Sequence, residues 1–138
     1  MNNEIASKLE LLEEYTAILR GYQQHDVEDL MRDHTLRGAV ERYIEVALEC
    51  MIDIGEMIIS KEKLKRPDTY RDVFLVLGEH SILPGDFAKD LAPAAGFRNI
   101  LVHMYAKIDV DRLYYYLENN LEDIERFGKY IAQYLIKD

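Results

Sequence analysis

The stretch that decides the fold is Thr35–Ser60, which reads TLRGAVERYIEVALECMIDIGEMIIS. Its apolar residues recur in alternating steps of four and three, a spacing that places them on one face of a helix. They are Val40, Ile44, Ala47, Met51, Ile54 and Ile58. This period favours close packing against nearly antiparallel helices. The stretch therefore predicts the strongest helix of an all-α bundle.

The segments on either side of this stretch also read as helices. Apolar residues from Ile5 to Leu19 follow the same spacing, so we expect a first helix that ends near Gly21. Asp26 is a suitable N-cap for a short helical segment after it. On the other side, the apolar residues of Tyr70–Glu79 predict a further short helix.

A fourth helix is expected to begin around Pro84, because proline fits the first turn of a helix. Pro93 and Gly96 interrupt this segment. They predict a kink or break just before Arg98, which would release that arginine from ideal helical placement.

The last helix is predicted to open at Asp109 or Asp111 and to carry one apolar stripe as far as Leu135. The stripe consists of Leu113, Leu117, Leu121, Ile124, Phe127, Ile131 and Leu135. The fold prediction is therefore an all-α antiparallel bundle of four main helices plus short ones, forming a single domain over residues 1–138.

The composition suits a small globular domain. The chain has 138 residues, 49% of them hydrophobic, which is enough for one packed core. No apolar run approaches the roughly 18 residues of a membrane span, and the start shows no signal peptide. Cys50 is the only cysteine, so no internal disulfide forms and a buried, inert thiol is expected. These features predict a cytoplasmic location without membrane contact.

The net charge of −9 argues against nonspecific coating of nucleic acid, and we expect no binding to DNA. The charge is uneven, because residues 1–60 hold 13 acidic and 5 basic residues, whereas residues 61–138 hold 13 and 12. The second half contains a small basic cluster of Lys61, Lys63, Lys65 and Arg66. This cluster is interpreted either as a solvated loop or as a guide for an anionic ligand.

The segment Arg98–Tyr105, RNILVHMY, combines a guanidinium, an amide, an imidazole and a phenol. Arginine binds phosphate with a planar fork of donors, and histidine transfers protons near neutral pH. The combination indicates work on a phosphodiester. On an ideal helix, however, Arg98 and His103 lie about 140° apart around the axis. A kink or a second copy of the chain across a two-fold axis would bring them into one cleft, so we expect a homodimer.

Plainer interpretations of single residues remain open. A lone histidine is usually a structural hydrogen-bonding residue, a lone arginine a salt-bridge partner, and a lone tyrosine part of the core. Glu41, Glu45 and Glu49 read as a solvated charged face. The chain has no Glu-x-x-His or His-Glu-x-x-His spacing and no glycine-rich phosphate loop, so no metal site and no cofactor are predicted.

The pattern Arg98-x4-His103-x-Tyr105 resembles the signature of the HEPN superfamily, specifically its HepT-like toxin branch. The resemblance extends over most of the chain. It includes residues 37–44, 52–55, 70–74 and 97–105.

The resemblance implies a homodimeric, metal-independent endoribonuclease toxin whose two motifs line a shared cleft. It also implies a cognate antitoxin with a minimal nucleotidyltransferase fold, which transfers AMP to Tyr105 and silences the toxin. RNA carries its own nucleophile, the 2′-hydroxyl, so a proton carrier and a cation suffice for cleavage. His103 would be the general base or acid, and Arg98 would bind the phosphate.

The remaining site residues have supporting roles in this scheme. Asn99 would hold the imidazole or the backbone of the cleft, and Tyr105 would contact RNA. Asp53 and Glu41 are candidate supporting or interface carboxylates. Two alternatives stay open: a noncatalytic HEPN dimer that binds nucleotide or protein and partners a nucleotidyltransferase, and a purely structural helical dimer.

Overall fold

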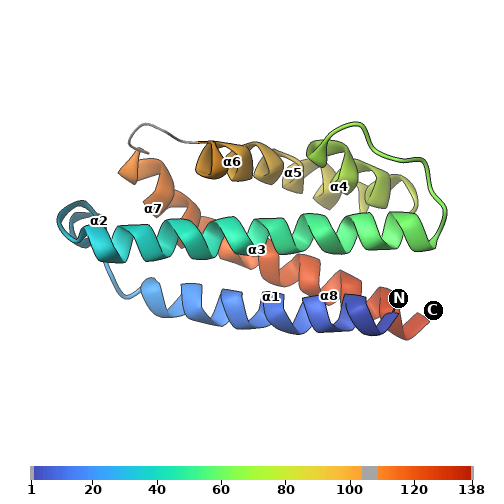
Figure 1. Ribbon diagram of the computed structural model, residues 1–138, viewed down its shortest axis with the longest axis horizontal. Coiled ribbons are helices and arrows are strands. Elements are labelled where there is room, and N and C mark those ends of the chain that lie inside the picture. Colours follow the sequence, from blue (N-terminus) through green and yellow to red (C-terminus); the bar gives the residue numbers. More distant parts are fainter. Residues whose placement is uncertain (1, 104–108, 138) are drawn as a thin grey trace.

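The computed structural model describes residues 2–103 and 109–137, and within them it shows helices and no strand. Figure 1 follows the chain through these helices. Their bounds are α1 Asn2–Tyr22, α2 Val27–Arg32, α3 His34–Lys61, α4 Tyr70–Glu79, α5 Gly85–Leu91, α6 Pro93–Val102, α7 Val110–Asn119 and α8 Leu121–Lys137. The all-α prediction is confirmed, whereas the dimer stays a prediction.

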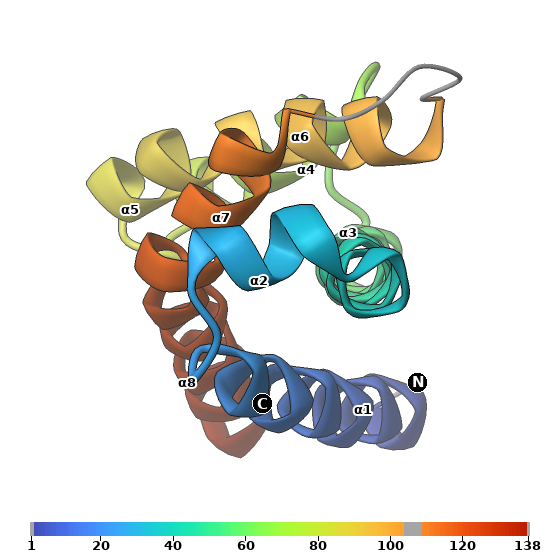
Figure 2. The ribbon, with the colours of Figure 1, turned by 90° about the vertical axis from the view of Figure 1, so that its left-hand side faces the viewer.

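Helix α3 is the central element of the molecule. It has 28 residues and thus a length of about 42 Å. Helices α1 and α8 lie on one side of it, and α4, α5 and α6 lie on the other (Figures 1 and 2). None of the helices in the described ranges is both long enough and apolar enough to cross a membrane.

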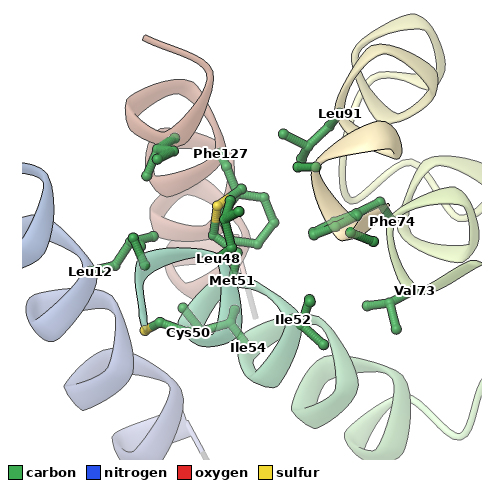
Figure 3. Packing of buried hydrophobic residues seen from close by; sticks show 14 of the residues in the cluster. Leu12, Leu48, Cys50, Met51, Ile52, Ile54, Val73, Phe74, Leu91 and Phe127 are labelled. Atoms are coloured by element: carbon green, nitrogen blue, oxygen red, sulfur yellow. The ribbon is translucent and has the colours of Figure 1, made fainter. Parts of the chain in front are cut away.

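The core forms around α3 because this helix buries more than one face. All six residues of its predicted stripe are completely buried. Leu48, Ile52 and Ile59 are buried as well, because neighbouring helices cover the other sides. Figure 3 shows side chains from α1, α4, α5 and α8 meeting those of α3. The rings of Phe74 and Phe127 meet edge to face, with centroids 6.0 Å apart.

Gly55 allows α3 and α4 to approach each other closely. A Cβ atom at this position would lie 2.4 Å from Cγ1 of Val73, which is far inside van der Waals contact. The absence of a side chain at Gly55 therefore determines how near the first turn of α4 lies to α3.

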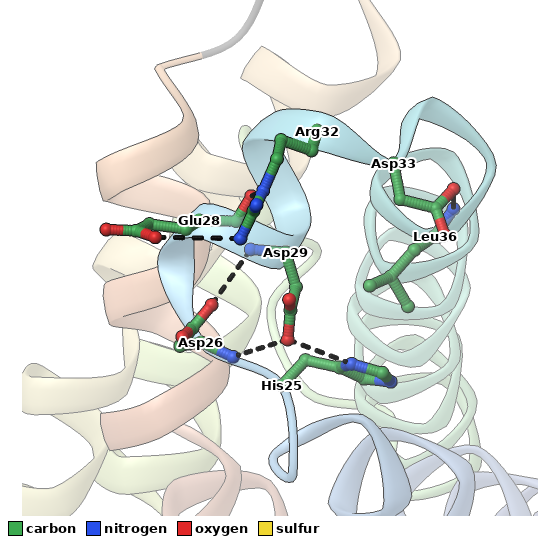
Figure 4. Close-up of polar contacts among 7 residues, drawn as sticks. All are labelled: His25, Asp26, Glu28, Asp29, Arg32, Asp33 and Leu36. Atoms are coloured by element: carbon green, nitrogen blue, oxygen red, sulfur yellow. Dashed lines mark hydrogen bonds and ion pairs between the residues drawn. The ribbon is translucent and has the colours of Figure 1, made fainter.

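Asp26 and Asp33 are the N-caps of α2 and α3, at the end of α3 that lies away from Gly55 (Figure 4). The side chain of Asp26 accepts a hydrogen bond from the Asp29 amide, and the Asp29 carboxylate accepts one from the Asp26 amide. This capping box confirms Asp26 as an N-cap. Asp33 caps α3 in the same way by accepting from the Leu36 amide.

The break predicted just before Arg98 lies earlier in the chain. Helix α5 ends at Leu91, and Pro93 occupies the first turn of α6. Proline cannot donate a backbone hydrogen bond, so the new helix begins there, whereas Gly96 continues it without interruption. The prediction that a kink releases Arg98 from helical placement is wrong, because Arg98 lies inside α6.

The predicted last helix is two helices. Asp109 caps α7 as expected, but α7 ends at Asn119 and α8 begins at Leu121. The apolar stripe continues across the interruption, since Leu117 and Leu121 are both buried. The spacing of the stripe therefore gave no sign of the break.

Candidate functional site

Helix α6 presents three of the predicted site residues. Arg98 is largely covered, Asn99 is exposed, and His103 is exposed at the C-cap, where its backbone amide donates to the Asn99 carbonyl at 3.0 Å. The opposite face of α6 is anchored in the core by Phe97, whose ring stacks on that of Tyr116 at 4.6 Å between centroids. The helix thereby holds its polar residues against α3 and α4.

The guanidinium of Arg98 is held from three sides. Its Nη2 donates to a Glu49 carboxylate oxygen of α3 at 3.3 Å, and its Nη1 donates to the Asn99 side-chain oxygen at 3.1 Å. Its central carbon lies 5.0 Å from the centre of the Tyr70 ring of α4, a cation–π distance. Only 17% of the Arg98 side chain is exposed, so these contacts fix its position.

Not every donor of Arg98 is satisfied by these contacts. A guanidinium has five N–H donors, and the contacts with Glu49 and Asn99 use one on each Nη. The buried Nε has no hydrogen-bond partner within residues 2–103 and 109–137. One hydrogen on each Nη also remains for an acceptor from outside the helix. Oriented donors of this kind suit phosphate oxygens.

Glu49 is the contact of the candidate site that sequence reasoning missed. The interpretation of Glu41, Glu45 and Glu49 as a solvated face is wrong, because all three side chains are only partly exposed and Glu49 pairs with Arg98. The other two pair along α3 with arginines, Glu45 with Arg42 at 2.6 Å and Glu41 with Arg37 at 3.9 Å. No sequence signal distinguished Glu49, since its partner lies 49 residues away.

The two candidate supporting carboxylates fall in different places. Asp53 lies one turn after Glu49 and lines the same small hollow of about 140 Å³ beside Arg98, while its carboxylate pairs with Lys8 of α1 at 3.3 Å. Glu41 lies two turns before Glu49, and burial raises the pKa of its carboxyl group. The structure thus brings Asp53, but not Glu41, to Arg98.

Within one chain, the side chains of Arg98 and His103 do not form a pair. No hydrogen bond connects their side chains in the part of the chain that the structure describes, as expected for residues about 140° apart around a helix. Tyr105 lies outside the described residues.

A larger hollow of about 870 Å³ adjoins this site. It lies between the end of α3, the loop that follows and the start of α4. The basic cluster divides around it. Lys63 and Arg66 line the hollow, Lys65 is exposed and does not line it, and Lys61 lies over the Tyr134 ring at 4.9 Å.

The arrangement of the described side chains gives little support to a reactive cysteine or to a metal site. Cys50 is buried, its thiol donates to the Lys8 carbonyl at 3.1 Å, and burial raises its pKa to about 11. It is the inert thiol that was predicted. Across residues 2–103 and 109–137, no group of three or more His, Cys, Asp or Glu side chains is placed to hold a metal ion.

Comparison with known proteins places this geometry in context. The sequence profile of the family described as ribonuclease HepT-like matches residues 6–131. A tRNA nuclease HepT of Aphanizomenon flos-aquae is 30% identical over 132 residues, which cover 96% of this chain and 90% of that protein. An mRNA nuclease HepT of Shewanella oneidensis is 29% identical over 102 residues, or 74% of this chain and 77% of that protein.

Solved structures with the same fold include toxins bound to their antitoxins. The tri-AMPylated HEPN toxin of Shewanella oneidensis, in complex with its MNT antitoxin, superposes with a TM-score of 0.86 at 26% identity. The match covers 96% of this chain and 99% of the toxin. A mutant MntA–HpeT toxin–antitoxin matches with a TM-score of 0.85 at 25% identity, over 94% and 98% of the two chains.

Proposed function

The chain belongs to the HepT-like ribonuclease family, and from this membership we propose that it is the toxin of a cytoplasmic toxin–antitoxin pair, a metal-independent endoribonuclease. The names of its relatives support RNA as the substrate, since one is a tRNA nuclease and another an mRNA nuclease. The solved toxin complexes support a nucleotidyltransferase antitoxin as its partner.

The observation that carries this proposal is the fixed guanidinium of Arg98. Glu49, Asn99 and Tyr70 orient it, and one donor on each Nη remains for a phosphate. During RNA cleavage the 2′-hydroxyl attacks the adjacent phosphorus, and negative charge develops on the nonbridging oxygens. A preoriented cation stabilises that charge without having to reorganise during the reaction.

His103 is proposed as the proton carrier. It lies at the exposed end of α6, where its imidazole is open to solvent and substrate. An imidazole near neutral pH can take the proton from the 2′-hydroxyl or return one to the leaving 5′-oxygen. Asn99 bonds to Arg98, so it is proposed to support the arginine rather than the histidine.

A homodimer is proposed because the site is incomplete in one chain. The side chains of Arg98 and His103 face different directions around α6, and the buried Nε of Arg98 lacks a partner among the described residues. A second α6 across a two-fold axis would bring the histidine of one subunit toward the arginine of the other. Each dimer would then contain two composite sites.

Regulation is proposed to act at Tyr105, seven residues after Arg98. Transfer of AMP by the antitoxin would add a bulky nucleotide with a negatively charged phosphate at the place where RNA must bind. Steric exclusion and like-charge repulsion would both reduce RNA binding. The tri-AMPylated state of the Shewanella oneidensis toxin supports this form of silencing.

The test is incubation of the unmodified protein with total RNA in EDTA, beside two histidine variants. His103 and His80 both occupy C-caps with nearly the same backbone angles, φ −98° and ψ 14° against φ −102° and ψ 16°. We expect His103→Ala to slow cleavage by about 100-fold or more, while His80→Ala cleaves like the parent. Circular dichroism checks that each variant keeps its helices.

One result would contradict the role of His103 and another the nuclease assignment. Cleavage by His103→Ala at the parental rate would show that the histidine is not needed for the reaction. Absence of cleavage by every folded protein would favour the second candidate, a noncatalytic module that binds nucleotide or protein. That candidate is supported by Glu49, which already neutralises Arg98, and by the net charge of −9.

A further inference from the structure

The larger hollow beside Arg98 has the features of a nucleotide-binding site. We propose that it holds the nucleotide next to the scissile phosphate of single-stranded RNA, with the base against Tyr70 and a phosphate on Lys63 and Arg66. This inference rests on the proposed nuclease function and adds to it a second place where the substrate is bound. The volume of the larger hollow, about 870 Å³, lies within the usual range for ligand sites.

The hollow is continuous with the Arg98 site. Tyr70 and Glu56 line both the larger hollow and the small hollow that contains Arg98. Asn99 lines the larger hollow and bonds to the guanidinium. A strand of RNA whose phosphate lies on Arg98 therefore has its neighbouring nucleotide at this opening.

Tyr70 provides a stacking surface. The guanidinium of Arg98 lies over its ring, yet 40% of the residue remains exposed. Bases stack on aromatic rings with little sequence preference, and the flat guanidinium on the ring extends the same platform. A base bound here would be read at its edge by the polar side chains of Glu56, Thr69 and Asn99.

Lys63 is held in place by an unusual backbone conformation. Its φ of 55° is in the left-handed region, which favours glycine at the end of a helix. The Lys63 amide donates to the Ser60 carbonyl and the Leu64 amide to the Ile59 carbonyl, the hydrogen-bond pattern of a Schellman motif. A lysine at the position where glycine fits best is explained if its ammonium group has a ligand in the hollow.

The charges around the hollow favour a nucleotide over an acidic peptide. Burial and the charge of Asp53 raise the pKa of the Glu56 carboxyl group, and the charge of Arg66 offsets part of this rise. The hollow thus combines two cations, the two carboxylates of Glu56 and Asp68, and an aromatic ring. A phosphate, a base amine and a base face match these three kinds of group, whereas a run of acidic side chains would be repelled by both carboxylates.

The experiment measures binding of a short fluorescent 2′-O-methyl RNA, which cannot be cleaved, as a function of salt concentration. Lys63→Gly removes the charge and relieves the backbone, so a loss of folding cannot explain weaker binding. We expect about fivefold weaker binding and a log–log salt slope smaller by about 0.7, one phosphate contact on a single strand. Tyr70→Leu should weaken binding about tenfold.

Two matched controls isolate the hollow. Ser81 also has a left-handed backbone, with φ 61°, and Ser81→Gly relieves it without changing charge. Lys65→Gln removes a charge from the same loop but outside the hollow. Both should bind RNA like the parent, and Lys63→Gly should melt no lower than the parent.

The possible outcomes separate the hollow from the nuclease function. If the parent cleaves RNA and Lys63→Gly binds it like the parent, the hollow proposal fails and the nuclease assignment stands. Equal losses in Lys63→Gly and Lys65→Gln also reject the hollow, because they indicate only diffuse attraction. If the parent binds but does not cleave, and Lys63→Gly and Tyr70→Leu weaken binding, the hollow stands and the nuclease assignment fails. Absence of RNA binding by the parent overturns the hollow proposal.

Discussion

Arg98 acquires its geometry from residues that are remote in sequence. Its own helix contributes Asn99, while Glu49 comes from α3 and Tyr70 from α4. The pattern around Arg98 predicted a phosphate-binding arginine, but the sequence contained nothing that paired it with one glutamate among the four on α3. The role of Glu49 depends on how α6 packs against α3.

Glu49→Gln tests whether this carboxylate positions the guanidinium. The variant keeps the size of the side chain and a neutral acceptor but removes the charge that orients Nη2. We expect the rate of RNA cleavage at saturating substrate to fall about tenfold or more, because small misplacements of a catalytic group are costly. Single-turnover cleavage of a defined RNA measures this rate.

Glu45→Gln is the matched control, because Glu45 lies one turn away on α3 and pairs with Arg42 instead. It should leave the cleavage rate unchanged. A parental rate in Glu49→Gln, with its helices intact, would show that the ion pair has no part in positioning Arg98.

At the scale of elements, α3 and α4 approach each other closely at Gly55. Gly55→Ala would place a methyl group 2.4 Å from Cγ1 of Val73, so one helix must shift or the Val73 side chain must rotate. We expect the free energy of unfolding to fall by about 1–3 kcal/mol, the usual cost of overpacking. Urea denaturation followed by circular dichroism gives this value.

Gly38 provides the comparison within the same helix, since nothing lies within 4 Å of a Cβ built there. Gly38→Ala should stabilise the protein by about 0.5–1 kcal/mol. Val73→Ala removes the atom that the new methyl group would meet. In the Val73→Ala background, Gly55→Ala should therefore no longer lower the free energy of unfolding through overpacking. Equal stability of Gly55→Ala and the parent would mean that α4 can move away from α3 at no cost.

The sequence predicted helices more reliably than the breaks between them. The periodic stripes of α1 and α3, and the aspartates before α2 and α7, were sufficient because they act within a few residues. Asn120 interrupts the last stripe without changing its spacing, so the division into α7 and α8 depends on tertiary packing. Pro93 was recognised as a breaker, but the break was placed too near Arg98.

For the whole molecule, the central question is whether two chains share each site. The proposed dimer pairs Arg98 of one subunit with His103 of the other. An equimolar mixture of Arg98→Gln and His103→Ala subunits would then form hybrid dimers with one intact site. After unfolding and refolding together, the mixture should recover about a quarter of the parental activity, since about half of the dimers are hybrids.

Each variant refolded alone is the control and should remain inactive. Light scattering measures whether the parent and the mixture are dimeric. If the mixture stays inactive although hybrid dimers form, each site takes both residues from one chain. A monomeric parent that cleaves RNA would exclude the shared site altogether.

The ion pair between Glu49 and Arg98 joins an early part of the chain to a late one. During translation, α3 is synthesised before α6, and Arg98 is held by Glu49 only once α6 packs against α3. The proposed activity therefore requires at least that α6 has packed against α3. If the proposed function holds, a chain that ends before α6 lacks this pair and is expected not to cleave RNA.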